Sequence, residues 1–222
     1  MFSEKVWDHL LTLRAEKGVS GGGPYALACA ASLPREKLKR VSIVCGLGPP
    51  DIGMSGANWQ NWLGFTIGWR YAPLWLLRWY SRRDPVWRLD LTDEKRLELW
   101  KQSLANPKTL SHEKDIEVMK DDDNLRLSLR SSQESFAQGF DGVRQDGKSM
   151  CMNFGFRVED IRADLPVQLW YGKQDTFVPP IHGEQIAARL GGRAHLRMED
   201  EAHWSILVNW KKEILEDLIR RV

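Results

Sequence analysis

The stretch "EKGVSGGGPYALACAASLP", Glu16 to Pro34, decides the fold predicted for this chain. Gly18, Ser20 and Gly22 have the spacing G-x-S-x-G, which is typical of a nucleophilic serine on a sharp turn between a strand and a helix. Such a turn needs small neighbours, and we expect a Cβ at Gly18 or Gly22 to collide with the adjacent chain. The small residues from Pro24 to Leu33 predict the helix that follows the turn.

A glycine-rich phosphate loop is the alternative interpretation of this stretch. No G-K-[ST] follows the glycines, and the G-x-G-x-x-G pattern of dinucleotide-binding loops is not matched. The sequence therefore favours the serine turn over a phosphate cradle.

Length and composition narrow the class of protein. The 222 residues fit one domain with room for an inserted lid. The 32 basic and 30 acidic residues leave a net charge of +2, so no nucleic-acid partner is expected. The 3 cysteines are odd in number and lack CxxC spacing, which predicts no disulfide framework, no metal site and a cytoplasmic setting. No cofactor is predicted, and the charged N-terminus does not resemble a secretory signal.

Three apolar runs predict strands of a buried parallel sheet. They are "RVSIVCGLGPP" (40–50), "LPVQLWYGKQD" (165–175) and "RAHLRMED" (193–200). Helices are predicted at Val6–Leu13, over "PPIHGEQIAARLGG", and as one closing helix from Trp204 to Val222. Strands and helices that alternate in this way indicate the α/β class with right-handed crossovers.

Two further residues complete a candidate catalytic set with Ser20. Asp175 follows the second apolar run and His203 follows the third. The order Ser, Asp, His along the chain differs from both the chymotrypsin and the subtilisin orders. Asp51, after the first run, is the alternative acid, whereas His182 at a predicted helix start is expected to face solvent.

These segments together resemble the α/β-hydrolase superfamily, in particular single-domain hydrolases with a lid. The resemblance lies in "GVSGGGPYALACAASLP", "VSIVCGLGP" and "LPVQLWYGKQDTFVPPIHGEQIAARL" and runs from Gly18 to the C-terminus. It implies Ser20 as nucleophile, Asp175 as acid, His203 as base and the Gly21 N–H as an oxyanion donor.

The N-terminal part departs from the family pattern. The family places several strands, two helices and an H-G loop with the second oxyanion donor before the serine, whereas 17 residues precede Gly18 here. Arg14, Glu16 and Lys17 also fit poorly into a strand covered on both faces. We therefore expect a truncated, partial α/β-hydrolase fold: a core of residues 1–50 and 156–222 that lacks the N-terminal strands, and a helical lid over 51–155. A gene-model error, a short isoform and a member that has lost catalysis remain open as explanations.

The predicted lid is rich in aromatic residues. Seven tryptophans lie between Trp59 and Trp100. They either pack the lid or line an apolar acyl pocket, and the pocket candidates are Trp59, Trp62, Trp69, Trp75 and Trp79. Arg70, Arg78, Arg82 and Arg83 flank this stretch, so contact with a membrane surface is a further possibility. A membrane-spanning helix over 62–80 is not expected, because charges and a proline interrupt it.

The sequence thus predicts a serine hydrolase of carboxylic esters or related apolar acyl compounds, acting through an acyl-enzyme. Serine at the turn, rather than aspartate, argues against the epoxide-opening and dehalogenating relatives. The alternative is a catalytically impaired hydrolase scaffold that acts as a binding or membrane-associated protein.

Overall fold

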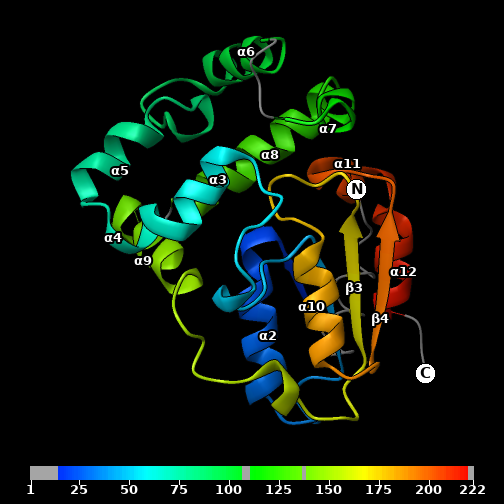
Figure 1. Ribbon diagram of the computed structural model, residues 1–222. Coiled ribbons are helices and arrows are strands. Elements are labelled where there is room, and N and C mark those ends of the chain that lie inside the picture. The colour runs from blue at the N-terminus through cyan, green and yellow to red at the C-terminus, as the bar shows by residue number, and fades with distance from the viewer. Residues whose placement is uncertain (1–14, 107–110, 137–138, 220–222) are drawn as a thin grey trace. The chain divides into compact units, whose positions relative to one another are not determined.

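The computed structural model describes residues 15–106, 111–136 and 139–219. The chain divides into two compact units: unit 1 is Met1–Ala57 with Asn153–Val222, and unit 2 is Asn58–Met152 (Figure 1). This division falls a few residues inside the ends predicted for the inserted segment. The helix predicted at Val6–Leu13 lies outside the described residues.

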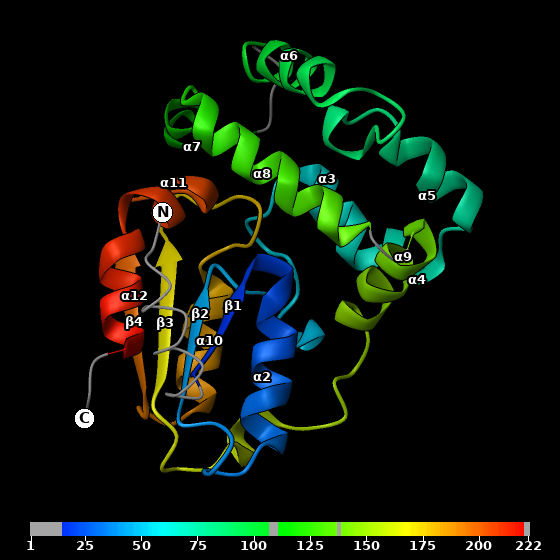
Figure 2. The same cartoon turned by 180° about the vertical axis from the view of Figure 1, so that it is seen from behind.

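Unit 1 is built on a parallel sheet of four described strands. They are β1 (Ala15–Val19), β2 (Arg40–Val44), β3 (Val167–Gly172) and β4 (Ala194–Glu199), in the order β1-β2-β3-β4 (Figure 2). All three neighbouring pairs are parallel, with Gly18 beside Ile43 and Val44 beside Trp170. The predicted α/β class is confirmed, because β2, β3 and β4 lie within the three predicted apolar runs and the sheet is parallel.

Helices pack on the sheet of unit 1 through neighbouring residues of β3. Because successive side chains of a strand point to opposite faces, Trp170 and Tyr171 lie on different sides of the sheet. Tyr171 contacts α10 (Ile181–Arg189) at Gly183, where an added Cβ would lie 2.4 Å from the tyrosine ring. Trp170 instead joins a buried cluster with Ile206 and Ile214. Those two residues belong to α11 (His203–Asn209) and α12 (Lys211–Ile219), while α2 (Gly23–Ser32) contacts β1 and β2.

The closing helix differs from the prediction of one continuous helix. It is interrupted at Trp210, whose backbone angles are φ −108° and ψ 14°. The Trp210 ring lies 5.8 Å from the ring of Trp170. Packing of this large side chain against the sheet accompanies the break between α11 and α12.

The charged residues before the serine do form a strand. Within the described residues, β1 pairs only with β2 and is therefore an edge strand. Glu16 and Lys17 are half-buried rather than enclosed, and Gly18 is the one fully buried residue of β1. Burial lowers the pKa of Lys17, and the nearby Lys211 lowers it further. The edge position lets these charges keep contact with solvent, which a central strand would not allow.

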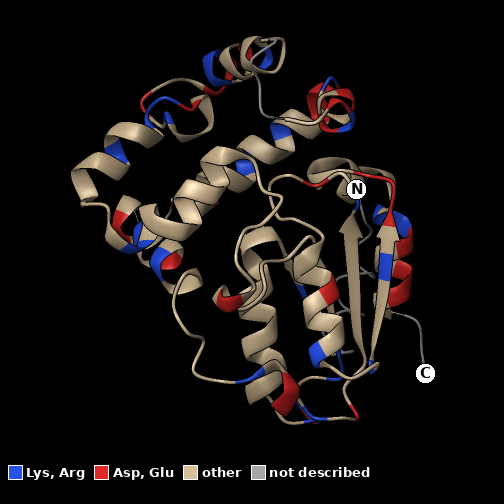
Figure 3. Ribbon diagram, viewed as in Figure 1, with Lys and Arg blue, Asp and Glu red and all other residues tan. Residues whose placement is uncertain are grey.

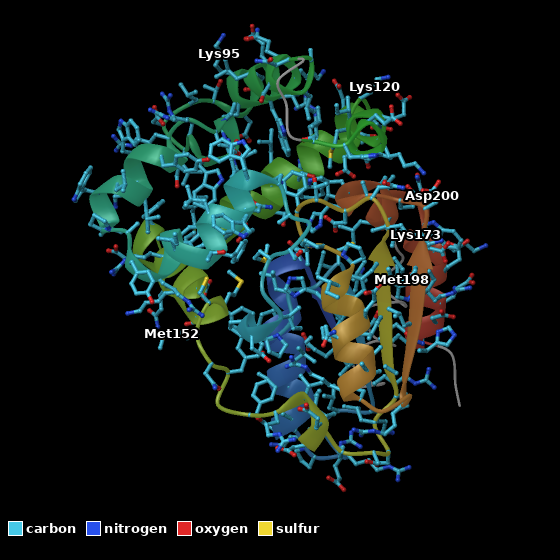
Figure 4. The ribbon with its side chains drawn as sticks, viewed as in Figure 1. Lys95, Lys120, Met152, Lys173, Met198 and Asp200 are labelled. Atoms are coloured by element: carbon cyan, nitrogen blue, oxygen red, sulfur yellow. The ribbon has the colours of Figure 1, made fainter. Side chains whose placement is uncertain are left out.

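The described residues of unit 2 form helices joined by turns and loops, without a strand. Its helices are α3 (Trp59–Leu63), α4 (Trp69–Tyr71), α5 (Leu74–Ser81), α6 (Asp93–Leu104), α7 (Glu113–Val118), α8 (Asp122–Ser135) and α9 (Gly139–Met150). Leu97, Leu125 and Leu129 are buried between α6 and α8. Lys95 on α6 and Lys120 after α7 are exposed on this unit (Figure 4).

Unit 2 has two notable local features, an acidic N-terminus on α8 and a π-helical segment. Asp121 is the N-cap of α8, and its carboxylate accepts the Asp123 N–H at 2.8 Å. The acidic run at 121–123 therefore begins a helix, where the positive end of the helix dipole favours negative charge. Between α3 and α4, Gly64–Gly68 forms a π-helical segment.

Candidate active site

Ser20 lies on a strained turn directly after β1. The 3-10 turn Ser20–Gly22 leads from that strand into α2. Ser20 has φ 52°, a left-handed conformation that residues with a side chain rarely adopt. A Cβ at Gly18 would lie 2.5 Å from the Gly22 carbonyl oxygen, so glycine is required there. Gly21, the predicted oxyanion donor, is the middle residue of the turn.

The expectation for Gly22 is wrong. A Cβ built on Gly22 would meet nothing within 4 Å. The close approach occurs at Gly23, where a Cβ would lie 2.6 Å from the Leu47 carbonyl oxygen. The chain that passes beside the turn is thus the loop after β2, and it crosses one residue later than the motif alone suggests.

The loop after β2 is strained as well and is joined to the serine turn. Cys45, the first residue after the strand, has φ 46°. The Leu47 N–H donates to the Ser20 carbonyl at 3.0 Å. This hydrogen bond links the backbones of the two loops that leave β1 and β2.

His182 and Tyr171 fix the same loop from the side of α10. The Tyr171 hydroxyl donates to the Gly46 carbonyl at 2.6 Å, and the Gly48 N–H donates to His182 Nδ1 at 3.0 Å. The expectation that His182 faces solvent is wrong, because its side chain is buried. Burial lowers its pKa to about 4, so Nδ1 stays free to accept at neutral pH. The adjacent Gly183 lets α10 approach the sheet closely, and this glycine was the feature of the sequence that could have indicated a buried His182.

Asp175 is held by backbone groups and by a histidine. It lies three residues after β3, and its Oδ1 accepts the Phe177 and Val178 N–H groups at 2.7 and 2.9 Å. Its Oδ2 lies 2.7 Å from His203 Nδ1. The carboxylate is buried, and these three hydrogen bonds satisfy it.

Asp51, the alternative acid, has a different partner. Its carboxylate forms a bidentate ion pair with Arg189, at 3.2 and 2.6 Å. The hydrogen bond from this guanidinium lowers the pKa of the exposed Asp51. The structure therefore brings Asp175, and not Asp51, to the histidine.

His203 connects the acid to the serine. It is the first residue of α11, and its buried ring has Nε2 3.0 Å from Ser20 Oγ. If Nδ1–H donates to Asp175, Nε2 is left as the acceptor for the serine hydroxyl. The three candidates thus converge from turns after β1, β3 and β4. Lys173 and Asp200 mark two of these strand ends in Figure 4.

Two aromatic residues beside His203 were not predicted from the sequence. The Phe177 ring lies 5.4 Å from the imidazole at a tilt of 35°, and the Trp204 ring lies 5.8 Å away, edge-on at 87°. In the sequence, only their positions, two residues after Asp175 and one after His203, indicated that they could lie near the histidine. They give the histidine an apolar surround.

Cys45 lies close to the same pair. A ligand atom from each of Cys45, Asp175 and His203 lies within 4.8 Å of the others, and all three residues are buried. Such a donor set suits zinc chemically. However, the Asp175–His203 hydrogen bond already occupies two of the three groups, so the cluster is better described as part of the serine site.

The five predicted pocket tryptophans separate into two groups. Trp69 packs inside unit 2, stacked on Trp87 at 6.4 Å and against Gly147, where a Cβ would lie 2.4 Å from its ring. The other four are 46–69% exposed, namely Trp59, Trp62, Trp75 and Trp79. A pocket-lining role for these residues stays a prediction. Among the residues that the structure describes, none of the helices has the length and apolarity to cross a bilayer.

Comparison with known proteins shows which fold this is. No protein-family model matches the sequence, and no curated protein matches it significantly. Solved structures do match. An esterase from Exiguobacterium antarcticum superposes with TM-score 0.53 at 13% identity, covering 91% of this chain and 64% of that one. An alpha/beta fold family hydrolase from Bacillus anthracis gives TM-score 0.51 at 17% identity, with 92% and 66% coverage.

A hydrolase from Pseudomonas aeruginosa is similar to a comparable degree, with TM-score 0.50, 16% identity and coverage of 98% of this chain and 70% of that one. The chain therefore spans 64–70% of the length of these three structures. At such identities the similarity concerns the fold alone. The parallel order of the strands and these matches together show that the chain has the fold of the α/β-hydrolase superfamily.

Proposed function

We propose that this chain is a serine hydrolase that cleaves carboxylic esters or related apolar acyl compounds. The observation that carries the proposal is that His203 contacts both other residues. Its Nε2 lies 3.0 Å from Ser20 Oγ, and its Nδ1 lies 2.7 Å from Asp175 Oδ2. Nucleophile, base and orienting acid stand in this relation in every triad of this type.

The proposed reaction proceeds in two stages. Ser20 Oγ attacks the carbonyl carbon of the ester while its proton moves to His203 Nε2. Asp175 stabilises the imidazolium through Nδ1, and the imidazolium then returns the proton to the leaving alkoxide, which departs as the alcohol. Water attacks the acyl-enzyme with the same histidine as base, releases the acid and restores Ser20.

The developing negative charge on the carbonyl oxygen needs a donor. Gly21 follows the nucleophile, so its N–H is the natural first donor in this fold. The turn leads directly into the N-terminus of α2, where the helix dipole adds a partial positive charge.

The apolar surround of the histidine favours an apolar substrate. The Phe177 and Trp204 rings flank His203, and the negative faces of such rings favour an apolar acyl group over an anionic one. The similar structures include an esterase and hydrolases, and these names agree with the proposed cleavage of esters. Their low identity gives no guide to a particular ester.

Labelling with a fluorophosphonate probe tests the proposal most directly. The wild-type chain should react, Ser20→Ala should not, and Ser55→Ala, which changes an exposed serine on a loop, should react like wild type. Hydrolysis of p-nitrophenyl esters of increasing acyl length should follow the same pattern and give the preferred acyl group.

A folded protein that neither reacts with the probe nor cleaves these esters would favour the second candidate, a hydrolase scaffold used for binding or membrane association. The observation that supports this candidate is the half-buried pair Glu16 and Lys17 in the strand that carries Ser20. A cooperative thermal transition must accompany the negative result, so that misfolding is not mistaken for lost catalysis.

A further inference from the structure

One segment, most of which belongs to unit 2, has an unusual charge composition. From Ile52 to Arg83 the chain contains four arginines and five tryptophans but no aspartate or glutamate. The whole chain, by contrast, has nearly equal numbers of basic and acidic residues, 32 and 30. Positive charge and aromatic surface are therefore concentrated in the same short stretch.

Helix α5 presents both kinds of residue on one face. Trp75, Arg78, Trp79 and Arg82 are spaced i, i+3, i+4 and i+7, which places them in a single stripe. Trp75 is 69% exposed and Trp79 is 53% exposed. With Arg83, which like Arg82 lies directly after the end of α5, these residues line an open hollow, and the single charged residue within α5 is basic (Figure 3).

The arginines keep their charge close to the aromatic rings. The Arg83 guanidinium lies 3.7 Å from the centre of the Trp79 ring, an arrangement that tolerates partial removal of water. Arg78 pairs with Asp141 at 3.3 Å, but both side chains are exposed, so this ion pair contributes little. The guanidinium groups are therefore available to anionic oxygens.

We propose that this face, Trp75, Arg78, Trp79, Arg82 and Arg83, binds the surface of a bilayer that contains anionic phospholipids. Tryptophan prefers the boundary between acyl chains and headgroups, and arginine pairs with phosphate oxygens. The helix is too short to span a bilayer and suits a position parallel to its surface.

Single-stranded nucleic acid could also use arginine and stacked aromatic rings. Two other exposed residues of the segment favour lipid instead. Leu63 and Ile67 are 44% and 47% exposed in the same segment. Their aliphatic side chains have no ring on which a base can stack, whereas they can insert among acyl chains.

Vesicle binding of the full chain tests the proposal. The probe is phosphatidylcholine vesicles that contain phosphatidylglycerol, with pure phosphatidylcholine vesicles, soluble glycerophosphate and an oligothymidine as the other arms. The measurements are co-sedimentation and the blue shift of tryptophan fluorescence. Ser20→Ala serves as the background, so that failure of the proposed hydrolase activity leaves the result readable.

The expected result is binding to the anionic vesicles that weakens as salt is raised, with no competition by glycerophosphate. Arg82→Gln with Arg83→Gln should weaken it about 25-fold, at roughly fivefold for each arginine near an anionic surface. Arg82→Lys with Arg83→Lys should retain most of the binding. Trp75→Ser with Trp79→Ser should weaken it at least about tenfold through lost apolar contact.

Matched changes on α8 provide the control. Arg126, Leu127 and Arg130 are exposed in the same unit. Arg126→Gln with Arg130→Gln, and separately Leu127→Ser, should leave vesicle binding within about twofold, since a charge outside the bound face acts only through screened, long-range attraction. Circular dichroism of each variant confirms that the helices are intact.

Several outcomes overturn the proposal. One is binding to the oligothymidine but not to vesicles, which would assign the face to nucleic acid. Another is unchanged vesicle binding in the arginine and tryptophan variants, which would place the contact elsewhere. Absence of binding to all four probes by a folded protein would leave the face without this role.

Discussion

Units 1 and 2 differ in the solvent exposure of their large apolar side chains. In unit 1 the central strands are almost fully buried, and Val44, Trp170 and Ile206 are inaccessible to solvent. Among the described residues, every large hydrophobic side chain with substantial exposure belongs to unit 2, with the exception of Tyr25. Unit 1 therefore buries nearly all its large apolar side chains, whereas unit 2 leaves aromatic surface exposed.

The candidate functional residues of the two units differ in exposure in the same way. In the candidate site of unit 1, Asp175 and His203 are buried and Ser20 is half-buried, and hydrogen bonds hold these side chains, as the Phe177 and Val178 N–H groups hold Asp175. The proposed lipid-binding face of unit 2 consists of exposed side chains on α5 and on the two residues that follow it. Substitutions should accordingly have large effects on catalysis and stability in the first region, and effects on binding alone in the second.

The largest expected effect is that of Asp175→Asn. The amide should retain the contacts of Oδ1 but hold His203 in the wrong tautomer, with a loss of about 10⁴-fold in kcat for ester hydrolysis. Asp51→Asn is the matched control: it breaks an exposed ion pair, should leave kcat unchanged and should cost at most about 1 kcal/mol of unfolding free energy. Equal losses in the two variants would contradict the assignment of the acid.

The buried His182 should make stability depend on pH. Its pKa in the folded protein is about 4, below the ordinary value of 6.5, so between these values the unfolded chain binds more protons. The free energy of unfolding should be highest above pH 6.5 and decrease as pH falls toward 4, by up to about 3 kcal/mol.

Urea unfolding of wild type and His182→Asn at several pH values measures this effect. Asparagine offers an oxygen that can accept the Gly48 N–H but does not titrate. The difference in unfolding free energy between the two proteins should therefore change across the pH window. A constant difference would mean that His182 titrates as an ordinary exposed histidine.

Substitution of Gly18 and of Gly22, the two motif glycines beside Ser20, should have very different effects on the free energy of unfolding. Gly18→Ala places a Cβ against the Gly22 carbonyl and the Ala26 side chain, and should destabilise unit 1 by about 1–3 kcal/mol. Gly22→Ala has open space and φ −77°, so its effect should stay within about 0.5 kcal/mol. Denaturant unfolding of both variants provides the comparison, and similar values would argue against the close packing described for this turn.

The smallest expected effect concerns the exposed face of unit 2. Trp75→Ser with Trp79→Ser should change the free energy of unfolding by less than about 0.5 kcal/mol, because both side chains are largely exposed. Leu129→Ala, which empties a buried position on α8, should cost about 2–5 kcal/mol by the same measurement. Strong destabilisation by the tryptophan changes would show that protein, and not a lipid surface, covers them.

Local patterns allowed much of unit 1 to be predicted. Apolar runs bounded by glycine and proline gave the strands β2, β3 and β4, because a strand covered on both faces must be apolar along its whole length. The spacing around Ser20 and the positions of Asp175 and His203 after the strands indicated which residues would meet. Parallel strands bring their carboxyl ends to one edge of the sheet, so residues distant in sequence converge there.

Other features could not be inferred from local patterns. Whether Glu16 and Lys17 can lie in a strand depends on whether that strand is at an edge, and the acid could be chosen only once Arg189 was seen to pair with Asp51. The break at Trp210 coincides with packing on Trp170, a residue far away in the sequence. Apolar spacing gives no information on such long-range contacts.

The sequence by itself therefore determined the α/β class, the order of the strand and helix segments and the candidate residues Ser20, Asp175 and His203, with Asp51 as an alternative acid, because periodicity and motif spacing are local properties. Only the tertiary structure decided that His182 is buried, that Gly23 rather than Gly22 meets the neighbouring loop, and that Phe177 and Trp204 flank the histidine. These outcomes depend on which segments approach one another in space, and burial and close contact are set by that approach rather than by neighbours along the chain.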